Sequence, residues 1–268
     1  MHLHVEVAGE GRPVVLLHGL TASHRYVVMG SRRLERSGHR VVAYDARGHG
    51  SSDPAPDPTA YGYDHLVADL LRILDEQEIE QAVLAGASMG AHTALRAALE
   101  HPDRVSGLVL ATPAFLPGKQ SDPRALARWD RLADGLASGG VEGFLAAFRF
   151  DDVPEAWRET VRKVTAQRLA VHEHPDAVAD ALRAVPRSAP LGDLAELAAI
   201  AVPTAVVGSR DEADAGHPLA VARQYADAIP GAELLVEEEG QSPIAWRGGQ
   251  LSEVIATVAE RADAATRA

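Results

Sequence analysis

The sequence contains no cysteine. A disulfide framework, a thiolate nucleophile and a cysteine zinc site are therefore excluded. The sequence also lacks an apolar run long enough to cross a bilayer. Residues 1–10 show no basic segment followed by an apolar one, which is the pattern of a signal peptide. From these absences we expect a cytoplasmic protein.

Positive charge is in deficit, with 26 Lys and Arg against 38 Asp and Glu and a formal net charge of -12. An acidic surface repels both phosphate backbones and anionic membranes. We therefore expect neither nucleic acid nor a membrane as a partner. A small-molecule substrate, neutral or apolar, is not disfavoured, and the sequence leaves open whether the chain forms a homo-oligomer.

Short apolar runs alternate with helical patterns along the 268 residues. Such alternation is typical of an α/β protein with a mostly parallel sheet flanked by helices. The runs that suit strands are 2–7, 13–17, 39–44, 81–85, 105–111, 202–207 and 233–236, and the helical patterns are 66–74, 89–100, 219–229 and 251–264. Residues 115–190 contain no strand pattern, so we interpret them as a helical cap inserted in a core domain formed by 1–114 and 191–268.

The segment 86–90 reads G-A-S-M-G and matches G-x-S-x-G. It follows a strand pattern directly and precedes a helix, which is the context that this motif requires. So sharp a strand-to-helix turn strains the serine, exposes its hydroxyl and places it at the positive end of the helix dipole. The motif therefore predicts Ser88 as a nucleophile.

A second loop is suited to stabilise the anion that forms after attack by Ser88. His18, Gly19 and Leu20 follow the first buried strand pattern. A loop at this place presents a backbone N–H, for which we choose Leu20, and the second donor is the N–H of Met89, the residue after the nucleophile. We interpret His18 as a structural residue rather than a base.

These motifs together resemble the α/β-hydrolase superfamily. They are H-G after one strand, D-x-R-G-H-G-x-S at 45–52 after the next, and G-x-S-x-G after the third. The pattern is most similar to the small esterases, lactonases and carbon–carbon bond hydrolases. The resemblance implies a Ser-His-acid triad, no cofactor, and structural roles for Asp45, Arg47 and His49. It also separates the chain from haloalkane dehalogenases and epoxide hydrolases, which carry an aspartate where this chain has Ser88.

The resemblance places the triad acid after the next-to-last strand and the histidine after the last. Asp211 is the first choice for the acid and Asp214 the second. The expected G-H-x-P pattern reads Gly240-Gln241-Ser242-Pro243, so Gln241 stands in the position of the histidine. A glutamine side chain cannot take a proton from a serine near neutral pH.

Three explanations for Gln241 stay open. The histidine was replaced by design, the lineage gave up the base, or another histidine took over. The neighbouring residues 246–249 also depart from the family pattern, which favours natural divergence. His217 is the tentative alternative base because its loop borders the active site in this fold, although it also suits the surface at a helix start. His24 is a candidate for the pocket mouth, and we expect His92 to face away.

Two H-x-H pairs remain, formed by His2 with His4 and by His172 with His174. Neither has a carboxylate motif beside it, so we interpret both as surface residues and expect no metal site.

The leading hypothesis is a serine hydrolase that cleaves a small ester, lactone or related acyl compound through an acyl-enzyme at Ser88. The alternatives are an impaired or pseudoenzyme hydrolase that binds a small molecule, and a non-hydrolytic lyase on the same scaffold. A histidine nitrogen within roughly 3 Å of the Ser88 hydroxyl would favour hydrolysis.

Overall fold

The computed structural model describes residues 1–212, 214 and 216–267 of the chain. Its centre is a seven-stranded sheet of order β1-β3-β2-β4-β5-β6-β7, parallel except for β1 against β3. The strands are β1 (Val5–Ala8), β2 (Arg12–Leu17), β3 (His39–Tyr44), β4 (Ala82–Ala87), β5 (Val105–Ala111), β6 (Thr204–Val207) and β7 (Glu233–Leu235). The prediction of an α/β-hydrolase fold with a mostly parallel sheet is confirmed.

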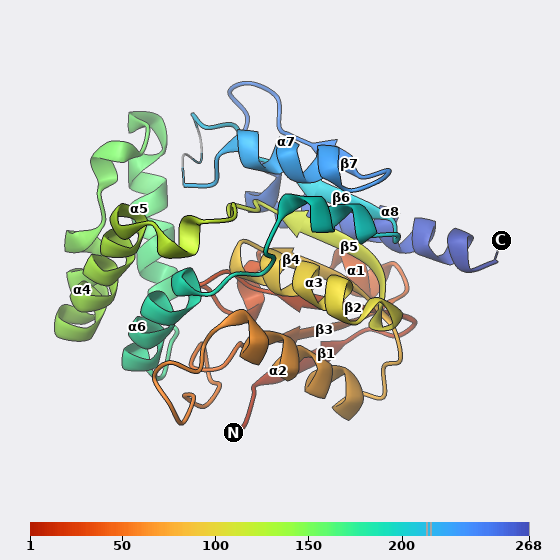
Figure 1. Ribbon diagram of the computed structural model, residues 1–268, viewed down its shortest axis with the longest axis horizontal. Coiled ribbons are helices and arrows are strands. Elements are labelled where there is room, and N and C mark those ends of the chain that lie inside the picture. The colour runs from red at the N-terminus through yellow and green to blue at the C-terminus, as the bar shows by residue number, and fades with distance from the viewer. Residues whose placement is uncertain (213, 215, 268) are drawn as a thin grey trace.

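Helices cover both faces of this sheet (Figure 1). One face packs against α2 (Tyr63–Glu76), α3 (Met89–Glu100) and α7 (Leu219–Ala228), and the other against α1 (Arg33–Arg36) and α8 (Gly248–Arg267). Parallel strands that are covered on both faces read as continuous apolar runs rather than alternating ones. This is why the strand patterns of the sequence were so plain.

The register of the parallel strands brings their carboxyl ends level at one edge. Leu17 pairs with Gly86 and Ala87 with Ala111, and Ala111 also pairs with Val207. The loops that leave β2, β4, β5 and β6 therefore begin side by side. Open α/β sheets place their ligand sites at this edge.

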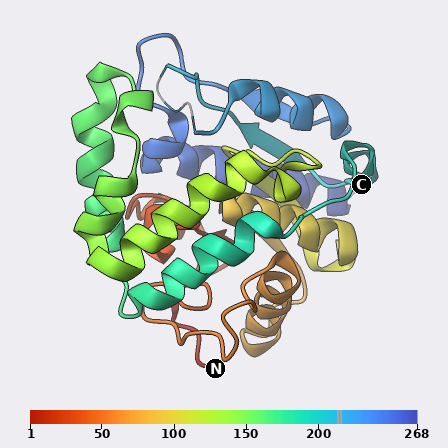
Figure 2. The same cartoon turned by 60° about the vertical axis from the view of Figure 1, so that its left-hand side comes forward.

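Residues 115–190, which we call the cap, are all described in the structure, lie between β5 and β6 and contain helices but no strand. These helices are α4 (Pro123–Ala147), α5 (Glu155–Leu169) and α6 (Pro175–Ala184), with short 3-10 turns between them. Figures 1 and 2 show these three helices grouped together at one end of the sheet. Side chains of the cap, including Phe144 and Leu182, join one apolar cluster with Leu20 and Met89 of the core. The cap thus packs on the residues that flank the nucleophile.

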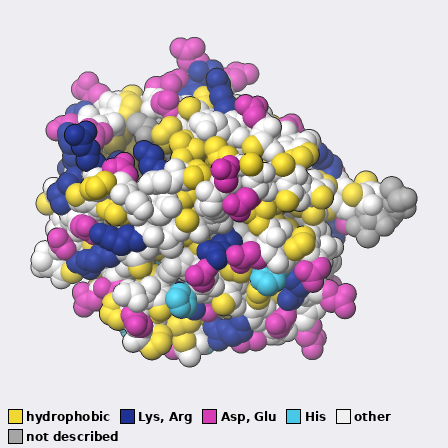
Figure 3. Space-filling view, in the orientation of Figure 1, with side chains coloured by type: hydrophobic (Ala, Val, Ile, Leu, Met, Phe, Trp, Pro, Cys, Tyr) yellow, Lys and Arg dark blue, Asp and Glu magenta, His cyan; other side chains and the backbone are white. Residues whose placement is uncertain are grey.

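The surface carries mixed charge. Figure 3 shows acidic side chains spread over the visible face, with basic ones interspersed among them. Among the described helices, none combines the length and the apolar character that a membrane span needs.

Candidate active site

Ser88 lies at the turn between β4 and α3 in a strained backbone conformation. Its φ is 50° and its ψ is -111°, a region that residues with a side chain seldom occupy. The turn has room only for glycine at positions 86 and 90. A Cβ on Gly86 would lie 2.2 Å from the carbonyl carbon of Gly90, and a Cβ on Gly90 would lie 2.1 Å from the Leu17 oxygen. The N–H of Ser88 donates to the oxygen of Ala111 at 2.9 Å, which ties the turn to β5.

Gly90→Ala is expected to destabilise the protein by about 1–3 kcal/mol, because the new methyl group overlaps the backbone of β2. Gly249→Ala is the matched control, since nothing lies within 4 Å of a Cβ there. Chemical denaturation of both variants measures the difference. Equal stabilities of the two variants would contradict the close packing of the elbow.

His217 lies against Ser88, the predicted nucleophile. Its Nε2 is 3.0 Å from Ser88 Oγ, and its Nδ1 is 2.9 Å from Asp214 Oδ2. The side chains of His217 and Asp214 are only 28% and 16% exposed. A nucleophile, a nitrogen base and a carboxylate that orients the base form the arrangement of a catalytic triad. Both partners of Ser88 come from the loop between β6 and α7.

The electrostatics of this pair suit proton transfer. Burial by itself lowers the pKa of His217, but the charge and the hydrogen bond of Asp214 outweigh it and raise the pKa above the ordinary 6.5. Burial raises the pKa of Asp214, and the opposing effect of His217 and of Arg168 leaves it below its ordinary value. Asp214 is therefore ionised at neutral pH and stabilises a protonated His217.

Asp211, the first choice for the acid, makes a different contact. Its Oδ1 accepts a hydrogen bond of 2.8 Å from the N–H of Leu219 and so caps the start of α7. The hydrogen bond to the histidine is made instead by Asp214, the second choice. The backbone explains this choice. The N–H of His217 donates to the backbone oxygen of Asp214 at 3.1 Å, which brings the two side chains within hydrogen-bond distance.

Glu237 was not singled out from the sequence. Its Oε1 accepts hydrogen bonds from the N–H of Arg210 at 2.6 Å and from Ser209 Oγ at 3.2 Å, and the residue is 3% exposed. It joins the end of β7 to the start of the loop that carries Asp214 and His217. Three successive glutamates at 237–239 gave no signal that the first is buried.

The oxyanion side is held by His18. Its Nδ1 donates to the oxygen of Gly19 at 2.8 Å, and the N–H of Ala22 donates to the same oxygen at 2.9 Å. The Gly19 carbonyl and the Leu20 N–H belong to one planar trans peptide and point in opposite directions. The two hydrogen bonds to the carbonyl therefore also fix the direction of the Leu20 N–H. Gly19 is also next to the nucleophile, since a Cβ on it would lie 3.6 Å from Ser88 Cβ.

His18 is a structural residue in this arrangement. Its Nε2 accepts from the N–H of Ala46 at 2.9 Å, so both ring nitrogens are used. Complete burial lowers its pKa to about 3, which keeps the ring neutral. The second expected donor, the N–H of Met89, lies in the first turn of α3, where N–H groups have no partner within the helix.

Gln241 is exposed, and among the described residues the side-chain partner of Ser88 Oγ is His217 instead. Its N–H donates to the Glu238 oxygen at 3.0 Å, and the residue borders a cavity of about 540 Å³ between β7 and α8. The segment that follows packs against the cap, because the ring of Trp246 meets that of Trp157 edge-on at 5.6 Å. The loop after β7 thus contacts the cap.

Several other histidines are buried, among them His24, His92 and His172. His92 accepts from the N–H groups of residues 114 and 115. His24 is paired with Asp45 at 2.9 Å rather than free at a pocket mouth. The surface position predicted for His172 is wrong: it is 9% exposed and its Nδ1 accepts from the N–H of Gly50 at 2.8 Å, linking the cap to the core.

Asp45, Arg47 and His49 brace the loop after β3. Arg47 Nε donates to Asp69 at 2.7 Å. The Nε2 of His49 lies 2.6 Å from the oxygen of Leu20 and so supports the oxyanion loop.

Comparison with known proteins places this geometry in context. A putative carbamate hydrolase RutD from Variovorax paradoxus is 32% identical over 87% of this chain and 86% of its own. Epoxide hydrolase 3 from Siraitia grosvenorii is 37% identical over 45% of this chain, and the match spans only 38% of that relative. The esterase EaEST from Exiguobacterium antarcticum is similar in structure, with a TM-score of 0.73, 26% identity, and coverage of 96% of this chain and 95% of its own.

The chain also matches, over residues 12–209, the family described as alpha/beta hydrolase fold. This match covers well over half of the chain and contains the strand, elbow and oxyanion-loop segments of the site. The protein therefore belongs to the α/β-hydrolase family and has a hydrolase-like enzyme scaffold.

Proposed function

We propose that the protein is a serine hydrolase of small esters, lactones or related acyl compounds, with Ser88, His217 and Asp214 as its triad. The observation that carries the proposal is the 3.0 Å separation of His217 Nε2 from Ser88 Oγ. A base in contact with the nucleophile favours hydrolysis over the pseudoenzyme and the lyase.

The chemistry follows from these positions. Ser88 Oγ attacks the substrate carbonyl while His217 Nε2 takes its proton, and the N–H groups of Leu20 and Met89 hold the oxyanion. His217 then returns the proton to the leaving alcohol, and an acyl ester remains on Ser88. Water, deprotonated by the same histidine, attacks this ester and releases the acid. The carboxylate of Asp214 keeps Nδ1 protonated and stabilises the imidazolium in both halves of the reaction.

The relatives support a carbonyl substrate. Two are named a putative carbamate hydrolase and an esterase, and both names describe attack on a carbonyl carbon. The likeness to an epoxide hydrolase does not carry over its reaction, since the carboxylate nucleophile of that class is replaced by Ser88. The apolar cluster of cap side chains around Leu20 and Met89 suits an apolar acyl or alcohol group.

Covalent labelling tests the proposal. The protein is incubated with a p-nitrophenyl alkylphosphonate, and the peptide that contains Ser88 is analysed by mass spectrometry. We expect one adduct per chain on Ser88, with loss of p-nitrophenyl butyrate hydrolysis. Ser88→Ala should lose both labelling and turnover, whereas Ser138→Ala, at an exposed position of α4, should keep both. Unchanged turnover in Ser88→Ala would refute the proposal.

The pH profile provides a second test. Only neutral His217 can accept the proton, and its pKa is raised above 6.5, mainly by Asp214 acting against burial. We therefore expect kcat/KM to rise with pH to a plateau, with a midpoint above 6.5, and to fall as the pH drops through that midpoint. In Asp214→Asn the midpoint of the residual activity should move to lower pH. A midpoint that stays in place would show that another group titrates.

A further inference from the structure

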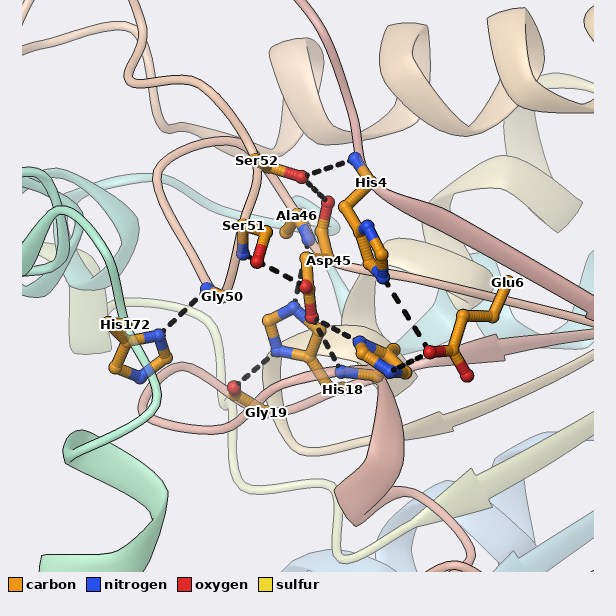
Figure 4. Close-up of polar contacts among 11 residues, drawn as sticks. His4, Glu6, His18, Gly19, Asp45, Ala46, Gly50, Ser51, Ser52 and His172 are labelled. Atoms are coloured by element: carbon orange, nitrogen blue, oxygen red, sulfur yellow. Dashed lines mark hydrogen bonds and ion pairs between the residues drawn. The ribbon is translucent and has the colours of Figure 1, made fainter.

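A cluster of three metal-ligating side chains lies apart from the triad, at the edge of the sheet. Glu6 lies in β1 and His4 directly precedes this strand, and the two residues, two positions apart in extended chain, point to the same side. His24, in the 3-10 turn η1 (His24–Tyr26) after the oxyanion loop, faces them. One donor atom from each of the three lies within 4.8 Å of the others. Figure 4 shows His4 directed toward the carboxylate of Glu6.

The distances are those of donors around a shared ion. Glu6 Oε1 lies 3.3 Å from His24 Nε2 and 3.8 Å from His4 Nε2. Zinc holds nitrogen and oxygen donors at about 2.0–2.1 Å, so donors at tetrahedral angles are roughly 3.3 Å apart. Donors in neighbouring positions of an octahedron would be closer, at about 2.9 Å, which is also the ordinary length of a hydrogen bond.

The Nε2 of His24 faces only the Glu6 carboxylate among the polar contacts of the described residues. It is buried and makes no hydrogen bond in the part of the chain that the structure describes. His24 is 9% exposed. Its Nδ1 faces Asp45 Oδ1 at 2.9 Å and donates to this carboxylate, which leaves the lone pair of Nε2 directed toward Glu6. Either a proton on Nε2 or a metal ion between the two atoms would join this nitrogen to the carboxylate.

The hydrogen bond between His24 Nδ1 and Asp45 is also typical of a metal-bound histidine. A histidine that binds a metal commonly donates its second N–H to a carboxylate, which fixes the ring and strengthens the metal bond. Asp45 is 1% exposed and also accepts from the N–H of His24 at 2.8 Å and from that of Ser51 at 3.2 Å. The partner that a metal-bound histidine needs is therefore already in place.

The backbone of His4 is held equally firmly. Its N–H donates to Ser52 Oγ at 2.9 Å, and its oxygen accepts from the N–H of Asp45 at 3.0 Å (Figure 4). Asp45 thus contacts two of the three ligands. This preorganisation distinguishes the cluster from exposed side chains that are near one another by chance.

We propose that His4, Glu6 and His24 form a binding site for a divalent cation of the zinc type, which clips the edge strand β1 to the turn after the oxyanion loop. Two imidazoles and one carboxylate suit zinc better than magnesium or calcium, which prefer oxygen ligands. Three side chains fill three of the four ligand positions of the ion. Because Glu6 is exposed, water can reach the fourth. The sequence did not predict this site, because β1 and β2 separate His4 from His24 along the chain. The H-x-H pair of His2 and His4 contributes only His4 to the cluster.

The test uses the full chain without a histidine tag, stripped of metal with a chelator and titrated with Zn²⁺ by calorimetry. We expect one ion per chain, weakened at least about 10-fold in His4→Ala and in Glu6→Gln. His2→Ala, which removes an exposed neighbouring imidazole, is the matched control and should bind as the unaltered chain does. Co²⁺ in place of Zn²⁺ should give the visible absorption bands of a tetrahedral complex, absent in Glu6→Gln.

Thermal unfolding provides an independent reading. Excess Zn²⁺ should raise the Tm of the unaltered chain and of His2→Ala, but not that of His4→Ala or Glu6→Gln. No zinc binding to the unaltered chain, or equal binding in all variants, overturns the proposal. In that case the cluster is an ion-pair network around a protonated His24. None of these outcomes depends on the proposed hydrolysis.

Discussion

His217→Ala is expected to lower kcat for p-nitrophenyl butyrate by about 10⁶-fold, the loss seen when the histidine of a serine triad is removed. Without the imidazole, no group within hydrogen-bond reach of Ser88 Oγ takes its proton, and a neutral serine hydroxyl is a poor nucleophile. The measurement is steady-state turnover with single-turnover acylation as a more sensitive check. Because the substitution leaves room for a small ring, added imidazole should restore part of the rate.

Gln241 supplies the control for this experiment. The residue is exposed and borders the cavity beside α8, so Gln241→Ala should keep full activity. Gln241→His places an imidazole at the position where the family resemblance predicts one, and we expect it to add little, because His217 already contacts Ser88. An inactive chain that Gln241→His activates would contradict the assignment of His217 and restore the position after β7.

The fold and the strand-to-helix turn at Ser88 could be predicted because they depend on short stretches of chain. Buried parallel strands need continuous apolar residues, and the elbow needs small residues at 86 and 90 whatever surrounds it. The helix that runs Met89–Glu100 was predicted to the residue for the same reason. These features are set by local sequence and by the sheet.

The contacts of the histidines could not be predicted, because each depends on a partner far along the chain. His172 accepts from Gly50, 122 residues away, and His217 meets Ser88 across 129 residues. The family resemblance predicted Gln241 at the histidine position and Asp211 as the acid. In the structure His217 instead forms a hydrogen bond with Asp214. Which of two nearby aspartates faces a histidine is decided by the backbone turn between these two residues, and spacing alone gives no preference.

The changed loop after β7 and the base in the loop after β6 belong together. Glu237 joins the first loop to the start of the β6 loop, and Trp246 joins it to the cap. With that loop committed to packing, a base from the neighbouring loop can occupy the space beside Ser88.

Asp214→Asn is the second large effect, and it decides which aspartate acts. An amide in place of the carboxylate leaves the geometry intact, but it stabilises neither the required tautomer nor the imidazolium, so kcat should fall by about 10⁴-fold. Asp211→Asn is matched in chemistry and three residues away. An asparagine oxygen still accepts from the N–H of Leu219, so this variant should retain both the start of α7 and nearly all activity. Steady-state kinetics of the pair, with Tm measured on both, separates catalysis from folding. A loss confined to Asp211→Asn would mean that Asp211 reaches the histidine in the working enzyme, whereas equal small losses would leave His217 acting without a carboxylate partner.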